Sequence, residues 1–327
     1  MAVQGLLLEA FGKFEDTISL KTWDAPPLQP WEVMIQVEGS PVNPADLNII
    51  EGKYGRLPNL PATLGNEGTG RVIQVGTGCS RVKLEDTVVV RPGAQGMWVN
   101  RTVVKETDCF VVPNDIPITQ RAMLVINPIT AFKMIEGVRS GGWVIQNAAN
   151  SAVGRSVVQL AKAQGVRSIN FVRRPELIEE LKKDGADHVF LDDEAGFVAA
   201  KEVLRHEQPL LGLNAVGGES ALRVANLLAP GGKLVTYGAM GRVPLKIPNG
   251  LLIFKNLSFT GFWVTAWLTT APVEEVQKVV STISTMMLSG ALTLSIQRTF
   301  HLNEFAQALV EAGKSGRRGK IVFVIGG

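Results

Sequence analysis

The middle of the chain, residues 121–265, alternates short apolar runs with helical patterns, and this alternation constrains the fold more than any other feature. Between the first two runs, Val157, Val158 and Leu160 follow the spacing of one helical face. Short strands that alternate with helices are typical of a doubly wound parallel α/β sheet. The predicted strands are Trp143–Gln146, Ser168–Val172, Val189–Leu191, Leu211–Ala215, Lys233–Tyr237 and Leu257–Thr260.

Residues 1–120 have a different pattern. Val33, Ile35 and Val37 recur at every second position, which is the period of a β-strand. Turns rich in Gly and Pro separate this run from further short strand candidates. Many short strands joined by such turns predict a small barrel or sandwich.

The tail adds an amphipathic helix over 273–287 and a last strand over 320–325. A chain of 327 residues exceeds the roughly 150 residues of one ordinary domain, so two domains are expected. We predict that residues 1–120 and 266–327 build one β-rich domain together, and that residues 121–265 build the other.

Composition excludes several classes of protein. Hydrophobic residues make up 46% and charged residues 19%, which argues against disorder. A net charge of +3 without a basic tract argues against a nucleic-acid partner. No apolar run reaches the ~18 residues that cross a membrane, and Glu9 precedes the first Lys, unlike a signal or transit peptide. We expect a soluble intracellular protein, in the cytoplasm if bacterial and in the mitochondrial matrix if a mature eukaryotic chain.

A loop of small residues, 147–154, follows the first strand of the middle segment and leads into a helix. Small residues allow backbone N–H groups to approach a pyrophosphate, and a helix N-terminus favours its charge. Only Gly154 is a glycine, so the loop departs from the usual G-x-G-x-x-G motif. Its place after the first of the alternating strands favours a dinucleotide site over a merely structural loop.

The second strand of the segment ends in Arg173 and Arg174, with no carboxylate before Glu176. Sites for NAD place an acidic residue there to bind the ribose diol. A guanidinium instead binds a 2′-phosphate through charge-assisted hydrogen bonds. The pair therefore predicts NADPH as the cofactor, and a solvated Arg pair at a helix start is the alternative.

Residues 65–70 (Gly-Asn-Glu-Gly-Thr-Gly) resemble the G-H-E-x-x-G motif of medium-chain dehydrogenases, and residues 44–46 resemble the segment after their first zinc-binding cysteine. Zinc-dependent members supply Cys, His and Cys in these regions. This chain has Asn43, Asn66 and Ile126-Asn127. Because catalytic zinc requires thiolate or imidazole ligands, we expect no metal and no zinc-assisted alcohol oxidation.

Longer stretches resemble the mitochondrial-type trans-2-enoyl-CoA reductases, a zinc-free branch of the medium-chain dehydrogenase/reductase superfamily that includes quinone oxidoreductases. The resemblance implies a GroES-like catalytic domain from both chain ends, a Rossmann domain between them, and a homodimer joined along the strand near Leu257–Val264. Glu85 stands where many relatives have Gly. The matching stretches are residues 41–61, 65–68, 126–131, 144–154, 235–240 and 261–263, with Phe254.

The same resemblance implies an enzyme that uses NADPH to reduce the carbon–carbon double bond of trans-2-enoyl thioesters, on coenzyme A or acyl carrier protein, as in fatty acid synthesis. The catalytic tyrosine of the branch matches Tyr54. The NADPH contacts that it implies are Asn127, Val153, Gly154, Arg155, Ser156, Arg173, Arg174, Tyr237, Gly238, Ala239, Met240, Phe262, Trp263, Val264 and Lys320.

Tyr54 also suits this chemistry on its own account. A tyrosine hydroxyl is protonated at neutral pH and donates to the charge that develops on a thioester oxygen. Gly52 and Gly55 flank it in a loop that allows an exposed side chain, although the ring could instead only pack at a domain edge. Phe262 and Trp263 are expected to line a pocket for an acyl chain, or else to be core aromatics.

Two other functions share these features. One is an NADPH quinone or enone (alkenal) oxidoreductase, which would have the same fold and cofactor. The other is a non-catalytic protein that binds NADPH. The presence of Tyr54 in its loop favours an enzyme.

Overall fold

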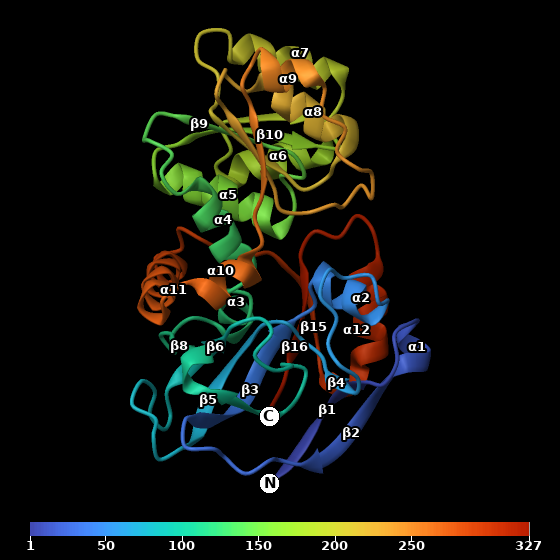
Figure 1. Ribbon diagram of the computed structural model, residues 1–327, viewed down its shortest axis with the longest axis vertical. Helices are drawn as coiled ribbons and strands as arrows, with labels where there is room; N and C mark the ends of the chain where they lie inside the picture. The colour runs from blue at the N-terminus through green and yellow to red at the C-terminus, as the bar shows by residue number, and fades with distance from the viewer. Residues whose placement is uncertain (327) are drawn as a thin grey trace. The chain divides into compact units, whose positions relative to one another are not determined.

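A computed structural model describes residues 1–326 of the chain (Figure 1). The chain forms two compact units. Unit 1 contains Met1–Ile129 and the residues from Thr265 onward, and unit 2 contains Thr130–Val264. The sequence pattern placed the first boundary at residue 120, whereas residues 121–129 belong to unit 1.

Unit 1 is built mainly from strands. These are β1 (Ala2–Leu8), β2 (Ile18–Asp24), β3 (Glu32–Pro41), β4 (Ala62–Thr63), β5 (Gly68–Val75), β6 (Thr87–Val90), β7 (Arg101–Lys105), β8 (Cys109–Val111), β15 (Ile296–Phe300) and β16 (Lys320–Val324). Its helical elements are α1 (Phe14–Thr17), α2 (Pro44–Ile50), η1 (Glu106–Asp108), α3 (Ile118–Arg121), α11 (Val273–Leu288), η2 (Leu302–Glu304) and α12 (Phe305–Gly313). At the unit boundaries lie α4 (Asn127–Ile135) and α10 (Val264–Thr270).

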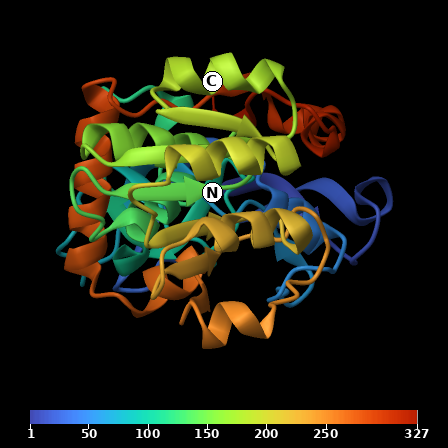
Figure 2. The same cartoon turned by 90° about the horizontal axis from the view of Figure 1, so that it is seen from above.

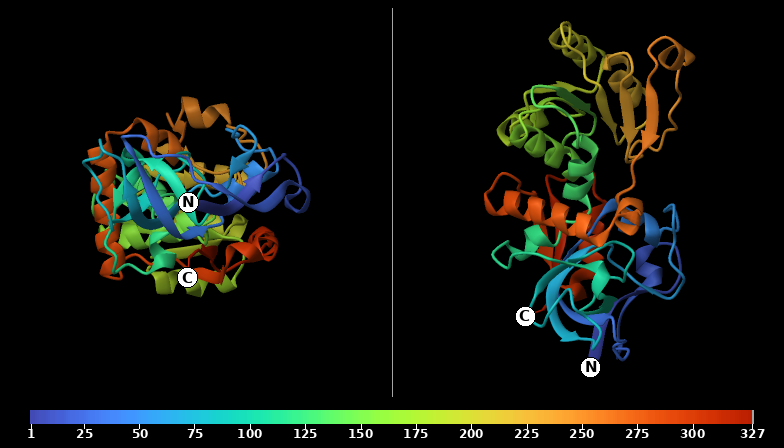
Figure 3. Two further views of the ribbon diagram at one scale, coloured as in Figure 1. Left: turned by 90° about the horizontal axis from the view of Figure 1, so that it is seen from below. Right: turned by 60° about the vertical axis from the view of Figure 1, so that its left-hand side comes forward.

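The two ends of the chain meet in one sheet of unit 1. Its strands run in the order β15-β16-β3-β5-β6-β8, with β7 also paired to β3, while β2-β1-β4 form a smaller sheet. Strand β16 lies antiparallel to β3, with Phe323 opposite Ser40. Both termini lie in this unit, and the blue and red strands run side by side (Figures 1 and 3). The prediction that both chain ends build one β-rich domain of GroES type is therefore confirmed.

Unit 2 is a six-stranded parallel sheet in the order β11-β10-β9-β12-β13-β14. Every predicted strand of the segment is present, and the ends differ by at most one residue. Helices cover both faces, with α5 beside α6 and α7 beside α8 (Figure 2). This is the doubly wound order of a Rossmann sheet, which confirms the predicted fold class. The elements are β9 (Trp143–Gln146), α5 (Ala152–Ala163), β10 (Arg167–Val172), α6 (Glu176–Asp184), β11 (His188–Leu191), α7 (Glu194–Val203), β12 (Leu211–Asn214), α8 (Gly218–Leu227), β13 (Lys233–Thr236), α9 (Asn249–Ile253) and β14 (Ser258–Gly261).

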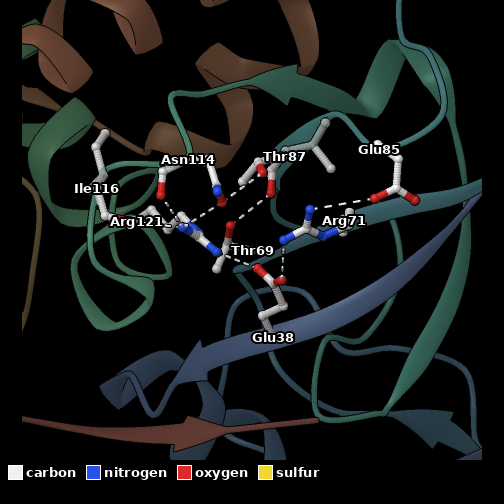
Figure 4. Close-up of polar contacts among 9 residues, drawn as sticks. Glu38, Thr69, Arg71, Glu85, Thr87, Asn114, Ile116 and Arg121 are labelled. Atoms are coloured by element: carbon white, nitrogen blue, oxygen red, sulfur yellow. Dashed lines mark hydrogen bonds and ion pairs between the residues drawn. The ribbon is translucent and has the colours of Figure 1, made fainter. Parts of the chain in front are cut away.

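A buried guanidinium explains why the chain after residue 120 stays with unit 1. Arg121, at the end of α3, donates to the carbonyl oxygens of Asn114 (3.0 Å) and Ile116 (2.9 Å) and forms an ion pair with Glu38 of β3 (Figure 4). Arg71 lies 3.5 Å from the same carboxylate. The Arg121 side chain is only 4% exposed, so its charge depends on these partners.

The outer end of this network carries a strained turn. Arg71 also lies 3.5 Å from the exposed carboxylate of Glu85 (Figure 4). Glu85 has a φ of 71°, in the left-handed region that favours glycine. A glycine at this position would adopt the same conformation without strain.

We expect Arg121→Met to destabilise unit 1 by about 3 kcal/mol, because it leaves Glu38 with only a distant partner in a mostly buried site. Denaturation in urea, followed by tryptophan fluorescence, measures the change, because Trp98 is buried in the same unit. Lys21→Met is the control, since the Lys21–Glu9 pair is exposed and surface pairs contribute little. Equal midpoints for the wild type and Arg121→Met would contradict the assignment.

Candidate active site

The loop between β9 and α5 is closely packed. The Ser151 hydroxyl caps α5 by accepting a hydrogen bond from the Gly154 N–H (3.0 Å), and the Gly154 carbonyl accepts one from the Gln146 side chain (2.9 Å). A Cβ atom on Gly154 would lie 2.6 Å from the carbonyl oxygen of Ala149 and 2.7 Å from that of Ala148. Only glycine therefore fits at this position. Without a side chain there, a diphosphate can approach the backbone N–H groups of the first turn of α5 closely.

A buried amide network supports this loop from below. Asn147 donates to the side-chain oxygens of Asn214 and Ser220, each at 2.9 Å, and accepts a hydrogen bond from the Ala215 N–H (2.8 Å). These bonds tie the end of β9 to the end of β12, where the strand order reverses. The sequence predicted Asn147 only as part of the loop 147–154 and Asn214 only as part of a strand. The sequence feature that could have indicated their role is a polar residue at the carboxyl end of an apolar strand.

Arg173 and Arg174 follow β10 directly. Arg173 is exposed, and no ion pair joins it to any of residues 1–326. Arg174 lies 3.4 Å from the Glu176 carboxylate, in a partly exposed pair. Both cations are therefore available to a phosphate group at the edge of the sheet.

Arg155 forms ion pairs with carboxylates of α6. Its guanidinium donates to Glu180 (2.8 Å) and pairs with Asp184, both on α6, and its backbone N–H donates to the Ser151 carbonyl (2.8 Å). A cation in the first turn of a helix opposes the helix dipole, and these carboxylates compensate it. Arg155 thus joins α5 to α6, and its contact with a cofactor, like those of Val153 and Ser156, stays a prediction.

Tyr237 follows β13 and buries its hydroxyl beside Ser151. Burial raises the pKa of Tyr237 to about 12, and the neighbouring Ser151 lowers it only in part, so the phenol is neutral at physiological pH. The hydroxyl has no hydrogen-bond partner among the described residues. The backbone then continues through Gly238 and Ala239 to Met240, whose N–H donates to the Ala215 carbonyl (2.8 Å).

The residues after β14 are not core aromatics. Phe262 is half-buried and Trp263 is 43% exposed, whereas Val264 is buried. Because all six strands are parallel, their carboxyl ends share one edge of the sheet. The fold therefore brings the unit 2 residues predicted after β9, β10, β13 and β14 to that edge.

Unit 1 carries a cluster of buried polar groups around residues 65–67 and the start of α2. The Asn43 amide donates to Glu67 (2.8 Å) and accepts hydrogen bonds from Lys320 and from Asn127 (3.3 Å). Glu67 also accepts a hydrogen bond from the Ile126 N–H (2.8 Å). The structure thus brings together the predicted residues Asn127 and Lys320, and it adds Asn43 and Glu67, which our sequence analysis did not assign to the site.

Asp46 holds the opposite side of this cluster. It accepts hydrogen bonds from the Asn43 N–H (2.7 Å), the Asn66 N–H (3.0 Å) and the Asn66 side chain (2.8 Å). Burial raises the pKa of Asp46 to about 6, although these hydrogen bonds lower it in part. The amides of Asn43 and Asn66 therefore serve as hydrogen-bond partners of carboxylates.

Burial also shifts the central pair toward neutrality. It raises the pKa of Glu67 to about 7 against the hydrogen bonds from Ile126 and Asn43, and it lowers the pKa of Lys320 to about 8 against the attraction of Glu67. Each group is the main charge that stabilises the other. Loss of either one would leave an uncompensated buried charge.

Tyr54 lies in the loop after α2 and packs half-buried against the core of unit 1. Gly52, with a φ of 70°, makes the turn that precedes it. The sequence suggested an exposed side chain, but the ring is partly covered because the loop folds back on the core.

Neither a metal cluster nor a membrane span is found in residues 1–326. No group of three or more His, Cys, Asp or Glu is arranged to hold a metal ion there. No helix in this part of the chain is long and apolar enough to cross a membrane.

Two family models match the chain. Residues 29–114 match the alcohol dehydrogenase GroES-like domain, and residues 152–285 match the zinc-binding dehydrogenase domain. Together with the two units, these matches define a medium-chain dehydrogenase/reductase.

Similar sequences identify the family within this class of dehydrogenases and reductases. The chain is 37% identical to the mitochondrial enoyl-acyl-carrier-protein reductase of Rattus norvegicus, over 94% of this chain and 84% of the relative. It is 35% identical to that of Arabidopsis thaliana, over 89% and 80%. The chain therefore belongs to the family of mitochondrial-type enoyl-acyl-carrier-protein reductases, which are oxidoreductases.

Solved structures agree with this. The complex of Etr1p with NADP and crotonyl-CoA superposes with a TM-score of 0.87 at 30% identity and covers 99% of this chain and 100% of that one. An NADPH:quinone reductase from Bacillus thuringiensis reaches 0.92 at 22% identity, with 99% of each chain covered. The second match shows the fold alone.

We expect Gly154→Ala to weaken NADPH binding by about tenfold or more, because the added Cβ pushes the loop carbonyls out of place. Titration calorimetry measures the affinity. Gly250→Ala in α9 is the matched control, since its Cβ would meet only Phe254, at 3.7 Å, and binding should not change. An unaltered affinity in Gly154→Ala would exclude this loop from the cofactor site.

Proposed function

We propose that this protein uses NADPH to reduce the carbon–carbon double bond of trans-2-enoyl thioesters. The observation that carries the proposal is the likeness along the full chain to Etr1p, solved with NADP and crotonyl-CoA, at 30% identity. The enoyl-acyl-carrier-protein reductases at 35–37% identity support the same substrate class. Coenzyme A and acyl carrier protein are both candidate carriers.

The residues of unit 2 fit a phosphorylated dinucleotide. Gly154 leaves space at the first turn of α5. Arg173, which forms no ion pair with any of residues 1–326, suits a 2′-phosphate. The Tyr237 hydroxyl, which is buried and has no hydrogen-bond partner within residues 1–326, is a further donor. When bound, NADPH supplies the hydride for the β-carbon of the substrate.

Tyr54 is the proposed catalytic residue. Its hydroxyl donates a hydrogen bond to the thioester oxygen, which becomes negative as the double bond is reduced, and helps to protonate the α-carbon. Packing of the ring against the core of unit 1 limits its motion, which favours a fixed donor. Phe262 and Trp263, which are not fully buried, are proposed to line the path of the acyl chain.

We propose that the active form is a homodimer joined along β14. This strand ends the sheet and is largely exposed, and the nearby Ile253 and Phe254 are 69% and 84% exposed. Exposed apolar side chains beside an open strand edge favour pairing with another copy. The named relatives are mitochondrial enzymes, and we place this chain in the matrix if it is eukaryotic and in the cytoplasm if it is bacterial.

An NADPH quinone or enone reductase is the second candidate. The high TM-score to the quinone reductase of Bacillus thuringiensis supports its fold, but the identity of 22% is below that of the enoyl reductases. A protein that only binds NADPH would not need the Tyr54 hydroxyl as a proton donor. Relative rates with an enoyl thioester and a quinone separate these functions.

Replacing both Arg173 and Arg174 by Ala should weaken NADPH far more than NADH. The loss of charge-assisted hydrogen bonds of about 1.5–3 kcal/mol each predicts a tenfold to several hundredfold weaker NADPH affinity. The control variant, Arg139→Ala with Arg205→Ala, removes two other exposed guanidinium groups of unit 2 and should leave both affinities unchanged. Equal losses for NADPH and NADH would mean that the pair has only a structural role.

Tyr54→Phe should lower kcat for crotonyl-CoA by about 10²–10³, because it removes one donor to the developing charge. NADPH affinity and thermal stability should stay near wild type, since the ring is retained. The wild type should also reduce crotonyl-CoA with a higher kcat/KM than a quinone. A variant within threefold of the wild-type rate, with normal NADPH binding, would remove Tyr54 from the mechanism, and a preference for the quinone would favour the second candidate.

A further inference from the structure

Helix α2 ends in a turn that leads directly to Tyr54. The Gly52 N–H donates to the Ile49 carbonyl (3.0 Å), and Gly52 has a left-handed φ of 70°. The Lys53 N–H donates to the Asn48 carbonyl (2.8 Å). These two bonds form a Schellman motif, which ends a helix and gives the following chain a defined direction. The end of α2 therefore determines the path of the backbone that carries Tyr54.

A segment from the start of the chain completes this helix end. The carbonyl groups at the end of a helix have no partner within it, and the Schellman motif satisfies only those of Asn48 and Ile49. The carbonyl of the buried Ile50 accepts a hydrogen bond from the Gly12 N–H (2.8 Å), in the segment between β1 and α1. The turn before Tyr54 is therefore tied to residues outside its own loop.

Phe11, the neighbour of Gly12, packs on the same turn. A Cβ atom on Gly52 would lie 3.0 Å from the Cβ of Phe11 and 3.3 Å from its Cγ. Phe11 is 38% exposed, so its side chain covers the turn and is not part of the buried core. Helix α12 contacts both α1 and α2, which keeps the two segments together in unit 1 (Figure 1).

We propose that Phe11 is a positioning residue for Tyr54. By packing on Gly52 beside the Gly12 hydrogen bond, it holds the turn after α2 and so keeps the Tyr54 hydroxyl in one place. The core of unit 1 supports the Tyr54 ring, and Phe11 supports the backbone that carries it. The inference rests on the proposed function, because it takes Tyr54 as the donor to the thioester oxygen.

The first test is the rate of crotonyl-CoA reduction. Phe11→Ala should lower kcat by about tenfold, because a small displacement of a positioned catalytic group has a large effect on rate. The loss should be larger in kcat than in KM, since the hydroxyl acts on charge that develops in the transition state. Phe11→Leu keeps an apolar contact with Gly52 and should retain most of the wild-type rate.

Trp31→Ala is the matched control. Trp31 is also an exposed aromatic residue of unit 1 that lies on a glycine, since a Cβ on Gly78 would be 2.7 Å from its ring. Trp31 precedes β3, whereas α2 follows this ten-residue strand, so its ring is remote from the Tyr54 loop. Its loss should leave kcat unchanged.

Limited proteolysis measures the mobility of the loop without reference to catalysis. Lys53 and Arg56 are exposed on either side of Tyr54, and trypsin cleaves after both residue types. Phe11→Ala should accelerate cleavage at these two positions by about threefold or more, because local opening exposes the loop to the protease. Trp31→Ala should not change the rate, and mass spectrometry identifies the cleaved bonds.

Gly52→Ala tests the same contact from the other side, and it keeps the proposal testable if Phe11→Ala does not fold. The added Cβ is strained at a φ of 70° and presses on Phe11, so kcat should fall. Gly290→Ala is its control, because Gly290 has a similar φ of 74° after α11 but no atom within 4 Å of the added Cβ.

A double-mutant cycle with Tyr54→Phe completes the experiment. If Phe11 acts through the Tyr54 hydroxyl, Phe11→Ala should add little to the loss in the Tyr54→Phe background. Additive losses, an unchanged kcat or unchanged cleavage in Phe11→Ala, or an equal loss of kcat in Trp31→Ala would overturn the proposal. A wild-type kcat in Tyr54→Phe would instead refute the proposed role of Tyr54, and the trypsin result would then decide whether Phe11 holds the loop.

Discussion

The pairing of β16 with β3 is the contact on which the site in unit 1 depends. It joins the last strand of the chain to one of the first, and the Val42 N–H continues the ladder by donating to the Ile321 carbonyl (2.9 Å). Lys320 is thereby placed against Asn43, 277 positions earlier in the sequence. A shift of the register by one residue would turn every side chain of β16 to the opposite face, and Lys320 would lose both Asn43 and Glu67.

The buried cluster formed in this way uses amides as hydrogen-bond partners of its charged groups. Amides are poor ligands for zinc, but each can donate and accept at once. Asn43 uses this property to separate a buried ammonium from a buried carboxylate while hydrogen-bonding to both.

In unit 2, hydrogen bonds and close packing fix the conformation of a loop of small residues. Its parallel strand order places the loop after β9 next to the end of β12, and Asn147 joins the two through Asn214 and Ala215. Gly154 then packs against the loop carbonyls at distances that no side chain permits. Gly154 is the only glycine of the loop 147–154, and the amide network supplies rigidity that a glycine-rich turn would obtain from its backbone.

Local patterns in the sequence determined much of this protein. The periods of apolar residues predicted the strands of unit 2 and the helix α11, because these periods follow from the geometry of single elements. The motifs around Tyr54 and Arg173 predicted the kind of chemistry, because residue type sets which groups can donate, accept or carry charge.

The tertiary structure alone decided which distant groups meet. The neighbours of Lys320 depend on the register of β16, and the ion pairs of Arg155 depend on how α6 packs beside α5. The partial burial of Tyr54 depends likewise on how its loop folds back on the core. Such contacts join residues far apart in the sequence through the packing of whole elements, and no local pattern encodes that packing.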